Sequence, residues 1–312
     1  MHPTRSAWPP GLYAHAGAAV HAAAAAPFDT WQRGTGAFTV HAQGFPIFLS
    51  AEDAAALDEY AEADPYAPEG QGQSAFWRWR LDVCGRLLSE AVAGGSPERV
   101  LDLGCGRADM LAALAERFPA TRFVGLDGSM AAISGADALP PNVDVCVGDA
   151  LRPPFLPGAF DGVLMMNLWE HVTDPIAMAR AARGLLRPGG WLLVSTPSRF
   201  RLENLVRALR GKDMALRSRQ HVTEYTVGQV VEQLRCAGFE VERVVGDDMP
   251  RGTGAGRLRG AAVRALLGAW KQLTGSHHAF GPTVFFLARP VPVDAGPQRA
   301  SPSTSARRSP HP

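Results

Sequence analysis

A turn with two glycines follows a short apolar run near residue 100. Residues 100–103 include Asp102, and Gly104 and Gly106 come next, just before a helical pattern begins. Because glycine has no Cβ, the backbone of such a turn can approach a ligand closely, and the first N–H groups of the new helix are available to polar ligand atoms. An acid directly before the glycines suits a ligand that carries an ammonium group and hydroxyls. The segment predicts a buried strand, a ligand-binding turn and a helix.

Two nucleotide-binding folds use a turn of this kind. The dinucleotide fingerprint G-x-G-x-x-G has no acid in front of it. Here Asp102 precedes the glycines, and the place of the third fingerprint glycine is taken by Asp109. Two glycines alone are weak evidence, because an ordinary tight connection between a strand and a helix has the same composition. The rest of the chain has to decide between these interpretations.

Strand patterns recur at regular spacing and are separated by helical patterns. They lie at residues 100–103, 121–126, 143–147, 160–166, 191–195, 239–245 and 283–288. Alternating strands and helices predict an α/β fold with a doubly wound, mostly parallel sheet. Ligands bind such sheets at the carboxyl ends of the strands. Four polar side chains fall at these ends: Asp102, Asp127, Asp149 and Asn167.

Taken together, these segments resemble the class I S-adenosylmethionine-dependent methyltransferases. The similar strings are VLDLGCG, FVGLD, GDA, FDGVLMMNLWEHVTDP, LLRPGGWLLVSTP, HVTEYT and AGFEV, from about Pro97 to Val245. The resemblance implies a Rossmann-like fold with a seven-stranded sheet whose last strand is antiparallel, and S-adenosylmethionine as the cosubstrate. One departure is Ala108, where many members of the family have a third glycine. Because alanine is small, we expect only a slightly altered turn.

The resemblance also assigns cosubstrate roles to individual residues. The acid and the glycines of the first turn would surround the methionine part. Asp127 would bind the ribose hydroxyls, Met130 would pack on the adenine, and Asp149 would accept a hydrogen bond from the adenine amino group. The full expected cosubstrate-binding set is Asp102, Gly104, Cys105, Gly106, Asp127, Gly128, Met130, Asp149, Ala150 and Asn167.

Methyl transfer from a sulfonium mainly requires that the acceptor, the methyl group and the sulfur are aligned and that water is excluded. A base is needed only if the acceptor keeps a proton at neutral pH, as a hydroxyl does. The candidate catalytic residues are His171, Glu170 and His221. Each has a structural alternative: His171 could brace the next helix, Glu170 could be a surface or helix-start acid, and His221 could only fix its loop. No metal is expected, because the pair His277-His278 has no other ligands at metal-binding spacing.

Composition narrows the expected compartment and partners. The 312 residues carry a formal net charge of +1, which disfavours nucleic acid as a partner, although basic helices leave RNA open as an acceptor. The four cysteines form no CxxC pair, as is typical of a reducing cytoplasm. No uncharged apolar run is long enough to span a bilayer. An Ala-rich stretch at 14–26 leaves a weak signal peptide as an alternative to the expected cytoplasmic location.

The chain divides into four expected regions. Residues 1–33 and 291–312 are predicted to be disordered from their composition. Residues 34–95 are interpreted as a lead-in hairpin, turning at Gln43-Gly44, followed by a cap helix over 76–92. Residues 96–290 form the predicted methyltransferase domain, with helical insertions on the acceptor side at 199–220 and 250–275.

Two amphipathic patterns in these insertions bear on the acceptor. Residues 199–210 and 257–273 each combine an apolar face with surrounding arginines, which in the first are Arg199, Arg201, Arg207 and Arg210. Such helices can lie on an anionic membrane surface, although most amphipathic helices only cover their own core.

We expect methyl transfer, at oxygen, to a small-molecule or lipid-linked acceptor, and the membrane hypothesis adds transient contact with the inner face of the membrane. One alternative is an N- or C-methyltransferase acting on a soluble metabolite such as a quinone precursor. Another is a non-catalytic protein that binds the cosubstrate.

Overall fold

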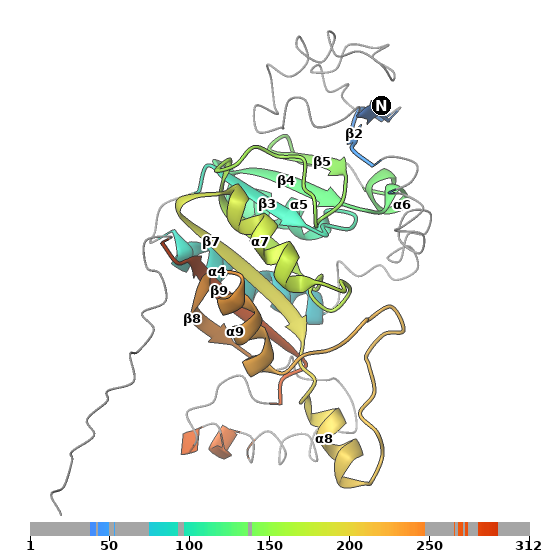
Figure 1. Cartoon of the computed structure of the whole chain (residues 1–312), viewed down its shortest axis with the longest axis vertical. Coiled ribbons are helices and arrows are strands. Elements are labelled where there is room, and N and C mark those ends of the chain that lie inside the picture. Colours follow the sequence, from blue (N-terminus) through green and yellow to red (C-terminus); the bar gives the residue numbers. More distant parts are fainter. Residues whose placement is uncertain are drawn as a thin grey trace, which may run out of the picture.

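The computed structural model describes residues 38–49 (without 42), 53, 75–92, 97–136, 139–246 and 280–292, and positions 265, 268–270, 272 and 273. Residues 1–33 and 293–312 of the ends expected to be disordered, much of the 34–95 lead-in and most of the second amphipathic pattern, 257–273, lie outside these residues. The described part forms the predicted α/β fold, with helices on both faces of a central sheet (Figure 1).

The sheet contains all seven predicted strands. Its order is β1-β2-β5-β4-β3-β6-β7-β9-β8. Strands β5, β4, β3, β6 and β7 run parallel, and β9 is antiparallel to both β7 and β8, which confirms the predicted antiparallel last strand. The strands are β1 (Thr39–Val40), β2 (Pro46–Ile47), β3 (Arg99–Leu103), β4 (Arg122–Asp127), β5 (Val143–Val147), β6 (Phe160–Met166), β7 (Leu186–Pro197), β8 (Phe239–Val245) and β9 (Thr283–Pro290).

The predicted hairpin before the domain is present and joins the sheet. Strands β1 and β2 pair antiparallel around Gly44, whose N–H donates to the carbonyl of His41 at 2.8 Å and whose φ is 90°. Strand β2 then pairs parallel with β5, where the N–H of Phe48 donates to the carbonyl of Val147 at 2.8 Å. The hairpin therefore adds two short strands to the seven that were expected.

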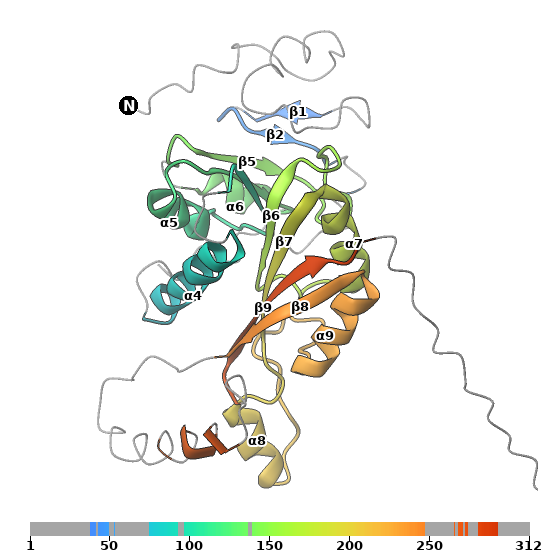
Figure 2. The ribbon, with the colours of Figure 1, turned by 90° about the vertical axis from the view of Figure 1, so that its left-hand side faces the viewer.

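Helices cover both faces of the sheet (Figure 2). On one face, α4 (Ala75–Ala91) packs against α5 (Asp109–Arg117) and β7, and α6 (Met130–Ser134) lies beside β4 and β5. On the other face, α7 (Pro175–Leu185) packs against α9 (Val227–Cys236). Neighbouring strand residues such as Val100 and Leu101 belong to the two opposite cores. Because both faces are buried, the strands read as continuous apolar runs in the sequence.

The fourth predicted strand approaches the fifth very closely at one glycine. A Cβ on Gly162 of β6 would overlap the indole ring of Trp191 on β7, and this indole is only 1% exposed. Gly162 also pairs directly with Trp191 in the register of the two strands. The absence of a side chain at Gly162 therefore makes room for one of the largest buried side chains of the core.

Helix α8 (Leu202–Leu209) stands beyond the carboxyl ends of the strands (Figures 1 and 2). It begins later than the predicted Arg199, because the N–H of Arg199 donates to the carbonyl of Tyr225 at 3.0 Å and its carbonyl accepts from Asn204. Arg201, one of the arginines around the predicted apolar face, is only 4% exposed. It is buried because it forms an ion pair with Glu224, a residue distant in the sequence.

Candidate active site

Asp102 lies near the end of β3 and has an unsatisfied carboxylate oxygen. The residue is 1% exposed, and Oδ1 has no hydrogen-bond partner within the described part of the chain. Burial, together with the charge of Asp127, holds the pKa of Asp102 well above its usual range, and the Arg80 guanidinium of α4 only partly opposes this. Leaving such a group without a partner is costly. A cationic ligand group is the kind of partner that this oxygen lacks.

The glycine turn after β3 packs closely against Leu168. Gly104 has a φ of 75°, and a Cβ at this position would lie 2.8 Å from Cδ1 of Leu168. The N–H groups of Gly104 and Cys105 both donate to the carbonyl of Leu126, and that of Gly106 donates to Oδ2 of Asp127 at 2.7 Å. These three donors are engaged within the protein, and the missing side chain of Gly104 makes room for Leu168.

Ala108 keeps the backbone conformation that a glycine would adopt. Its φ and ψ are 61° and 19°, it is fully buried, and it caps the N-terminus of α5. A left-handed conformation costs an alanine roughly 1–2 kcal/mol. The turn therefore retains its left-handed geometry at the cost of some strain, where the sequence predicted a slightly altered turn.

Asp127 ties the first turn to the beginning of α6. The carboxylate accepts from the N–H of Gly106 and, at 2.8 Å, from the N–H of Ser129, and the residue is 8% exposed. Each oxygen of an ionised carboxylate has a second lone pair that can still accept from a hydroxyl. Gly128 follows directly, and Met130 is the half-buried first residue of α6.

The end of β5 lies next to the end of β4. The N–H of Gly148 donates to the carbonyl of Asp127 at 2.9 Å, which brings Asp149 to the same edge of the sheet. The Asp149 carboxylate accepts from the N–H of Leu151 at 2.8 Å and from Nε of Arg152 at 3.0 Å. Ala150, which follows Asp149 directly, is half-buried.

Beyond β6, Asn167 and Glu170 form a buried hydrogen-bonded network. Asn167 has a φ of 59°, accepts from the Ser195 hydroxyl and donates from Nδ2 to Glu170 Oε1 at 3.1 Å. The second oxygen of Glu170 accepts from the Thr196 hydroxyl at 2.9 Å. Burial raises the pKa of Glu170 in spite of these hydrogen bonds. Glu170 is fully buried, so the interpretation as a surface acid was wrong.

The structure brings the three candidate catalytic residues together. The rings of His171 and His221 meet edge to face, with their centroids 4.8 Å apart. The loop of His221 is held by the N–H of Val222, which donates to the carbonyl of Glu170 at 2.8 Å. Burial, and next the charge of His221, lowers the pKa of His171 to about 4. His171 is therefore neutral near pH 7.

The same three side chains have the donor types of a metal site. One ligand atom from each of Glu170, His171 and His221 lies within 4.8 Å of the others. Both Glu170 oxygens, however, already accept hydrogen bonds from protein groups. The absence of a metal stays a prediction.

Glu224 is a site residue that the sequence did not identify. Its side chain is 1% exposed, and it accepts from Arg201, from the N–H of Arg217 at 2.5 Å and from Nδ1 of His221 at 3.0 Å. Burial alone would raise the pKa of Glu224, but these hydrogen bonds outweigh it and hold the pKa below its ordinary value. The only sequence signal was the His-x-x-Glu spacing.

The site has two halves at one edge of the sheet. The first contains the acids and glycines at the ends of β3, β4 and β5, and the second contains the network around Glu170. Leu168 connects them, because it belongs to the segment after β6 and packs on Gly104. A ligand over the glycine turn would lie beside the polar network of the second half.

Comparison with known proteins places the chain among methyltransferases. Residues 76–244 match the family model described as "Methyltransferase domain". A probable S-adenosylmethionine-dependent methyltransferase of Mycolicibacterium smegmatis is 32% identical over 180 residues, which cover 57% of this chain and 64% of that protein. A ubiquinone biosynthesis O-methyltransferase of Xylella fastidiosa is 30% identical over 205 residues, which cover 61% of this chain and 80% of that protein.

Two further comparisons define how far the likeness extends. A ubiquinone biosynthesis O-methyltransferase of Chromobacterium violaceum is 34% identical over 123 residues, which cover 38% of this chain and 51% of that protein. The match to the Chromobacterium protein thus spans about half of that relative, and the match to the Mycolicibacterium protein spans less than two thirds. Among solved structures, the cyclase SpnF is similar with a TM-score of 0.50 and 22% identity, over 72% of this chain and 86% of that one. This last likeness concerns the fold alone.

Proposed function

The chain belongs to the methyltransferase-domain family, the class I S-adenosylmethionine-dependent methyltransferases, and we propose that it methylates a hydroxyl oxygen of a small-molecule or lipid-linked acceptor. The observation that carries this proposal is the cluster of Glu170, His171 and His221 next to the glycine turn. A base is required only where the acceptor has to lose a proton, and a hydroxyl is such an acceptor.

The residues of the first half fit the cosubstrate. When bound, S-adenosylmethionine supplies an electrophilic methyl group on a sulfonium sulfur. The unsatisfied oxygen of Asp102 would accept from its ammonium group, and the glycines of the turn would let the methionine chain approach the backbone closely. Asp127 would bind the ribose hydroxyls with its carboxylate. Asp149 would accept from the adenine amino group, and Met130 would pack on the ring, with Cys105, Gly128, Ala150 and Asn167 lining the site.

Among the three candidate catalytic residues, His221 is best suited to remove the acceptor proton. His171 is a weak base, because its pKa is lowered to about 4. Glu170 is fully buried, and both of its oxygens hold neighbouring groups in place. We assign His171 and Glu170 to shaping the site and His221 to proton removal.

The names of the relatives support oxygen as the acceptor atom. Several of them are ubiquinone biosynthesis O-methyltransferases. An N- or C-methyltransferase remains the alternative within the family, because fold likeness does not determine the acceptor. A protein that only binds the cosubstrate is the other alternative, and it needs no organised base.

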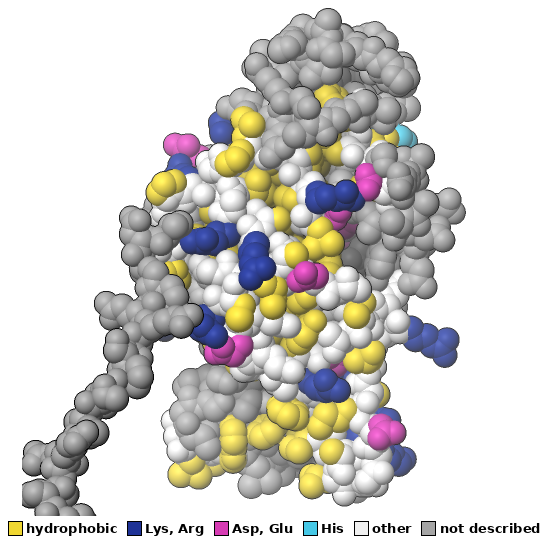
Figure 3. Space-filling model, in the orientation of Figure 1, with side chains coloured by type: hydrophobic (Ala, Val, Ile, Leu, Met, Phe, Trp, Pro, Cys, Tyr) yellow, Lys and Arg dark blue, Asp and Glu magenta, His cyan; other side chains and the backbone are white. Residues whose placement is uncertain are grey.

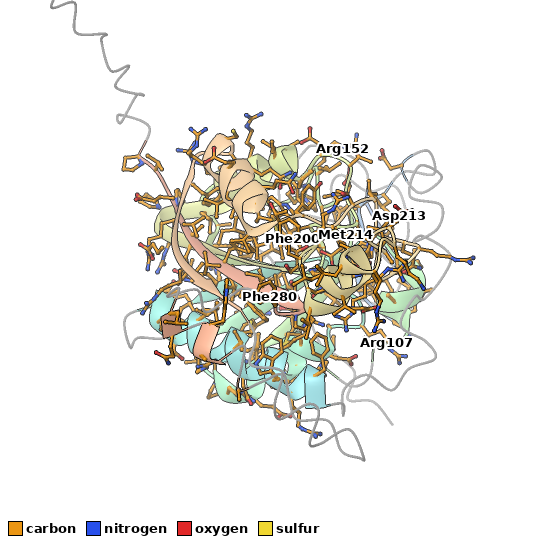
Figure 4. The ribbon with its side chains drawn as sticks, turned by 90° about the horizontal axis from the view of Figure 1, so that it is seen from below. Arg107, Arg152, Phe200, Asp213, Met214 and Phe280 are labelled. Atoms are coloured by element: carbon orange, nitrogen blue, oxygen red, sulfur yellow. The ribbon has the colours of Figure 1, made fainter. Side chains whose placement is uncertain are left out.

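Exposed apolar side chains around α8 support a lipid-linked acceptor reached from a membrane surface. Phe200, Leu209 and Leu216 are 50%, 79% and 47% exposed. Figure 3 shows hydrophobic side chains gathered at the α8 end of the molecule, and Figure 4, which views this end, places Phe200 and Met214 between Arg107 and Arg152 in projection. None of the described helices is long and apolar enough to cross a bilayer. We propose a cytoplasmic enzyme that contacts the membrane from one side.

Methyl transfer can be tested with labelled S-adenosylmethionine and simple acceptors. We expect label on catechol but not on aniline, and binding of S-adenosylhomocysteine by calorimetry at the micromolar scale of about −8 kcal/mol. The variant Asp127→Ala should weaken this binding by roughly 2–3 kcal/mol, because a charge-assisted partner of the ribose is lost. Label on the amine alone would favour the N-methyltransferase, and binding of NAD without S-adenosylhomocysteine would refute both.

Membrane contact can be tested separately by vesicle flotation. The protein should float with phosphatidylglycerol vesicles and not with phosphatidylcholine vesicles, because basic residues near an anionic surface contribute about 1 kcal/mol each. Replacing Arg207, Arg210 and Lys212 by glutamate should abolish flotation. The matched control is Arg235→Glu on α9, whose exposed arginine lies on another helix. Equal flotation of both variants, or none of the wild type, would leave a soluble acceptor.

A further inference from the structure

Glu224 holds together the segments that surround His221. Its carboxylate accepts from Arg201 at the beginning of α8, from the backbone of Arg217 and from the ring of His221. Arg201 also donates to the carbonyls of Ser198 and Ala215. The carboxylate is therefore fixed from several directions, and its hydrogen bond to His221 has a fixed geometry.

The state of Glu224 determines which nitrogen of His221 carries a proton. Glu224 is ionised near pH 7, because it pairs with the guanidinium of Arg201 and its pKa lies below the ordinary value. An ionised carboxylate can only accept hydrogen bonds. Nδ1 of His221, at 3.0 Å, must therefore be the donor. When the ring is neutral, its other nitrogen, Nε2, then has no proton and can accept one.

We propose that Glu224 is a positioning residue that holds His221 in the Nδ1–H form, with Nε2 directed to the chemistry of the site. This inference rests on the proposed function, because it gives His221 the role of the base. Two contacts place the ring at the site: its edge-to-face contact with His171 and the anchoring of Val222 to the carbonyl of Glu170. Glu224 itself reaches the acceptor only through His221.

The proton transfer balances within this arrangement. Nε2 of His221 takes the proton of the acceptor hydroxyl, while the acceptor oxygen forms a bond to the methyl carbon. The bond between that carbon and the sulfur breaks, and the sulfur keeps its electron pair. The imidazolium that results is stabilised by the negative charge of Glu224, and it later returns the proton to solvent.

The tautomer can be measured without any methyl acceptor. Ring-nitrogen chemical shifts of isotope-labelled histidine, recorded at alkaline pH and assigned with His221→Gln, should show the Nδ1–H form of His221 in the wild-type protein. In Glu224→Gln this form should be lost or mixed. The matched control is Glu203→Gln, because Glu203 lies 3.8 Å from Nε of Arg201 but is 73% exposed at its side chain. That variant should keep the wild-type shifts.

A double-mutant cycle tests the link to catalysis, with catechol as the acceptor. Glu224→Gln should lower kcat by about 10²- to 10⁴-fold and leave the binding of S-adenosylhomocysteine unchanged. In a His221→Gln background, the same change should have almost no further effect on kcat, because Glu224 acts through the ring.

Several results would overturn the proposal. One is an Nε2–H form of His221 in the wild-type protein, which needs no variant to fold. Another is a loss of kcat that multiplies across the two substitutions, because Glu224 would then act only by stabilising the loop. If catechol is not methylated but the tautomer is as expected, the positioning holds and the proposed acceptor class fails.

Discussion

Replacing Asp102 by asparagine should stabilise the ligand-free protein and weaken its binding of the cosubstrate. The carboxylate is 1% exposed and its Oδ1 has no partner among the described residues. At a pH where Asp102 is ionised, the change removes a buried charge without a partner, which costs at least the roughly 1–3 kcal/mol of an unsatisfied buried group. The same change removes the anion that would accept from the ammonium group, at a cost of about 1.5–3 kcal/mol in binding, or roughly 10- to 150-fold.

The gain in stability should grow with pH. The pKa of Asp102 is raised in the folded protein, so the folded state holds a proton that the unfolded chain has already released. The wild-type protein is therefore destabilised as the pH rises above the ordinary value for aspartate, whereas the variant is not. The difference in the free energy of unfolding should be larger at about pH 8 than at about pH 5.

Denaturant unfolding and calorimetry with S-adenosylhomocysteine measure the two effects. The matched control is Asp144→Asn, because Asp144 is a buried aspartate that pairs with Arg122 at 2.6 Å on a strand of the same sheet. This control should lose stability and keep its affinity. If Asp102→Asn instead lost stability and kept its affinity, Asp102 would be a structural carboxylate, and our assignment of the ammonium site would fail.

Further predictions concern pH and stability. The pKa of His171 is about 4 in the folded protein, whereas a histidine in the unfolded chain takes up a proton below about pH 6.5. The free energy of unfolding should therefore fall by about 2–3 kcal/mol as the pH is lowered from about 6.5 to about 4. The variant His171→Gln should remove this loss when unfolding is measured as a function of pH. Gly162→Ala should lower the free energy of unfolding by about 1–3 kcal/mol or more, because of overlap with Trp191; the additional change Trp191→Leu should recover part of it, and no loss in the single variant would contradict the packing. Thr226→Ala should cost about 1 kcal/mol in the same assay, because Thr226 and Gln229 form a capping box at α9.

The strands of the domain could be predicted because both faces of the sheet are buried. Residues 160–166 are an example: all are buried, and the predicted bounds agree with β6. Strand β7 begins at Leu186 rather than at Trp191, because Leu186 already pairs with Phe160 of β6. The segment Arg187-Pro-Gly-Gly, in which Gly189 has a φ of 80°, interrupts the register before Trp191 pairs with Gly162. Composition can mark such a turn, but it does not show that pairing with the neighbouring strand begins before it.

The site could be predicted only where topology dictates it. Parallel strands put Asp102 and Asp127 at one edge, as expected. The pair of Arg201 and Glu224 could not be foreseen, because an arginine within an amphipathic pattern normally faces solvent, and its burial depends on a partner distant in the sequence. The burial of Glu170 has the same origin, since Thr196 comes from a different strand.

The hairpin of β1 and β2 has a consequence for any shortened version of the chain. It pairs with the end of β5 at Val147, and all five residues of β5 are buried. A chain that starts after residue 50 would lose this pairing and leave the carbonyl of Val147 without the N–H of Phe48 at the edge of the sheet. Exposed apolar edge strands can pair with strands of other chains and form intermolecular sheets. Such a truncation should lower solubility and promote aggregation, although it removes none of the residues proposed to bind the cosubstrate.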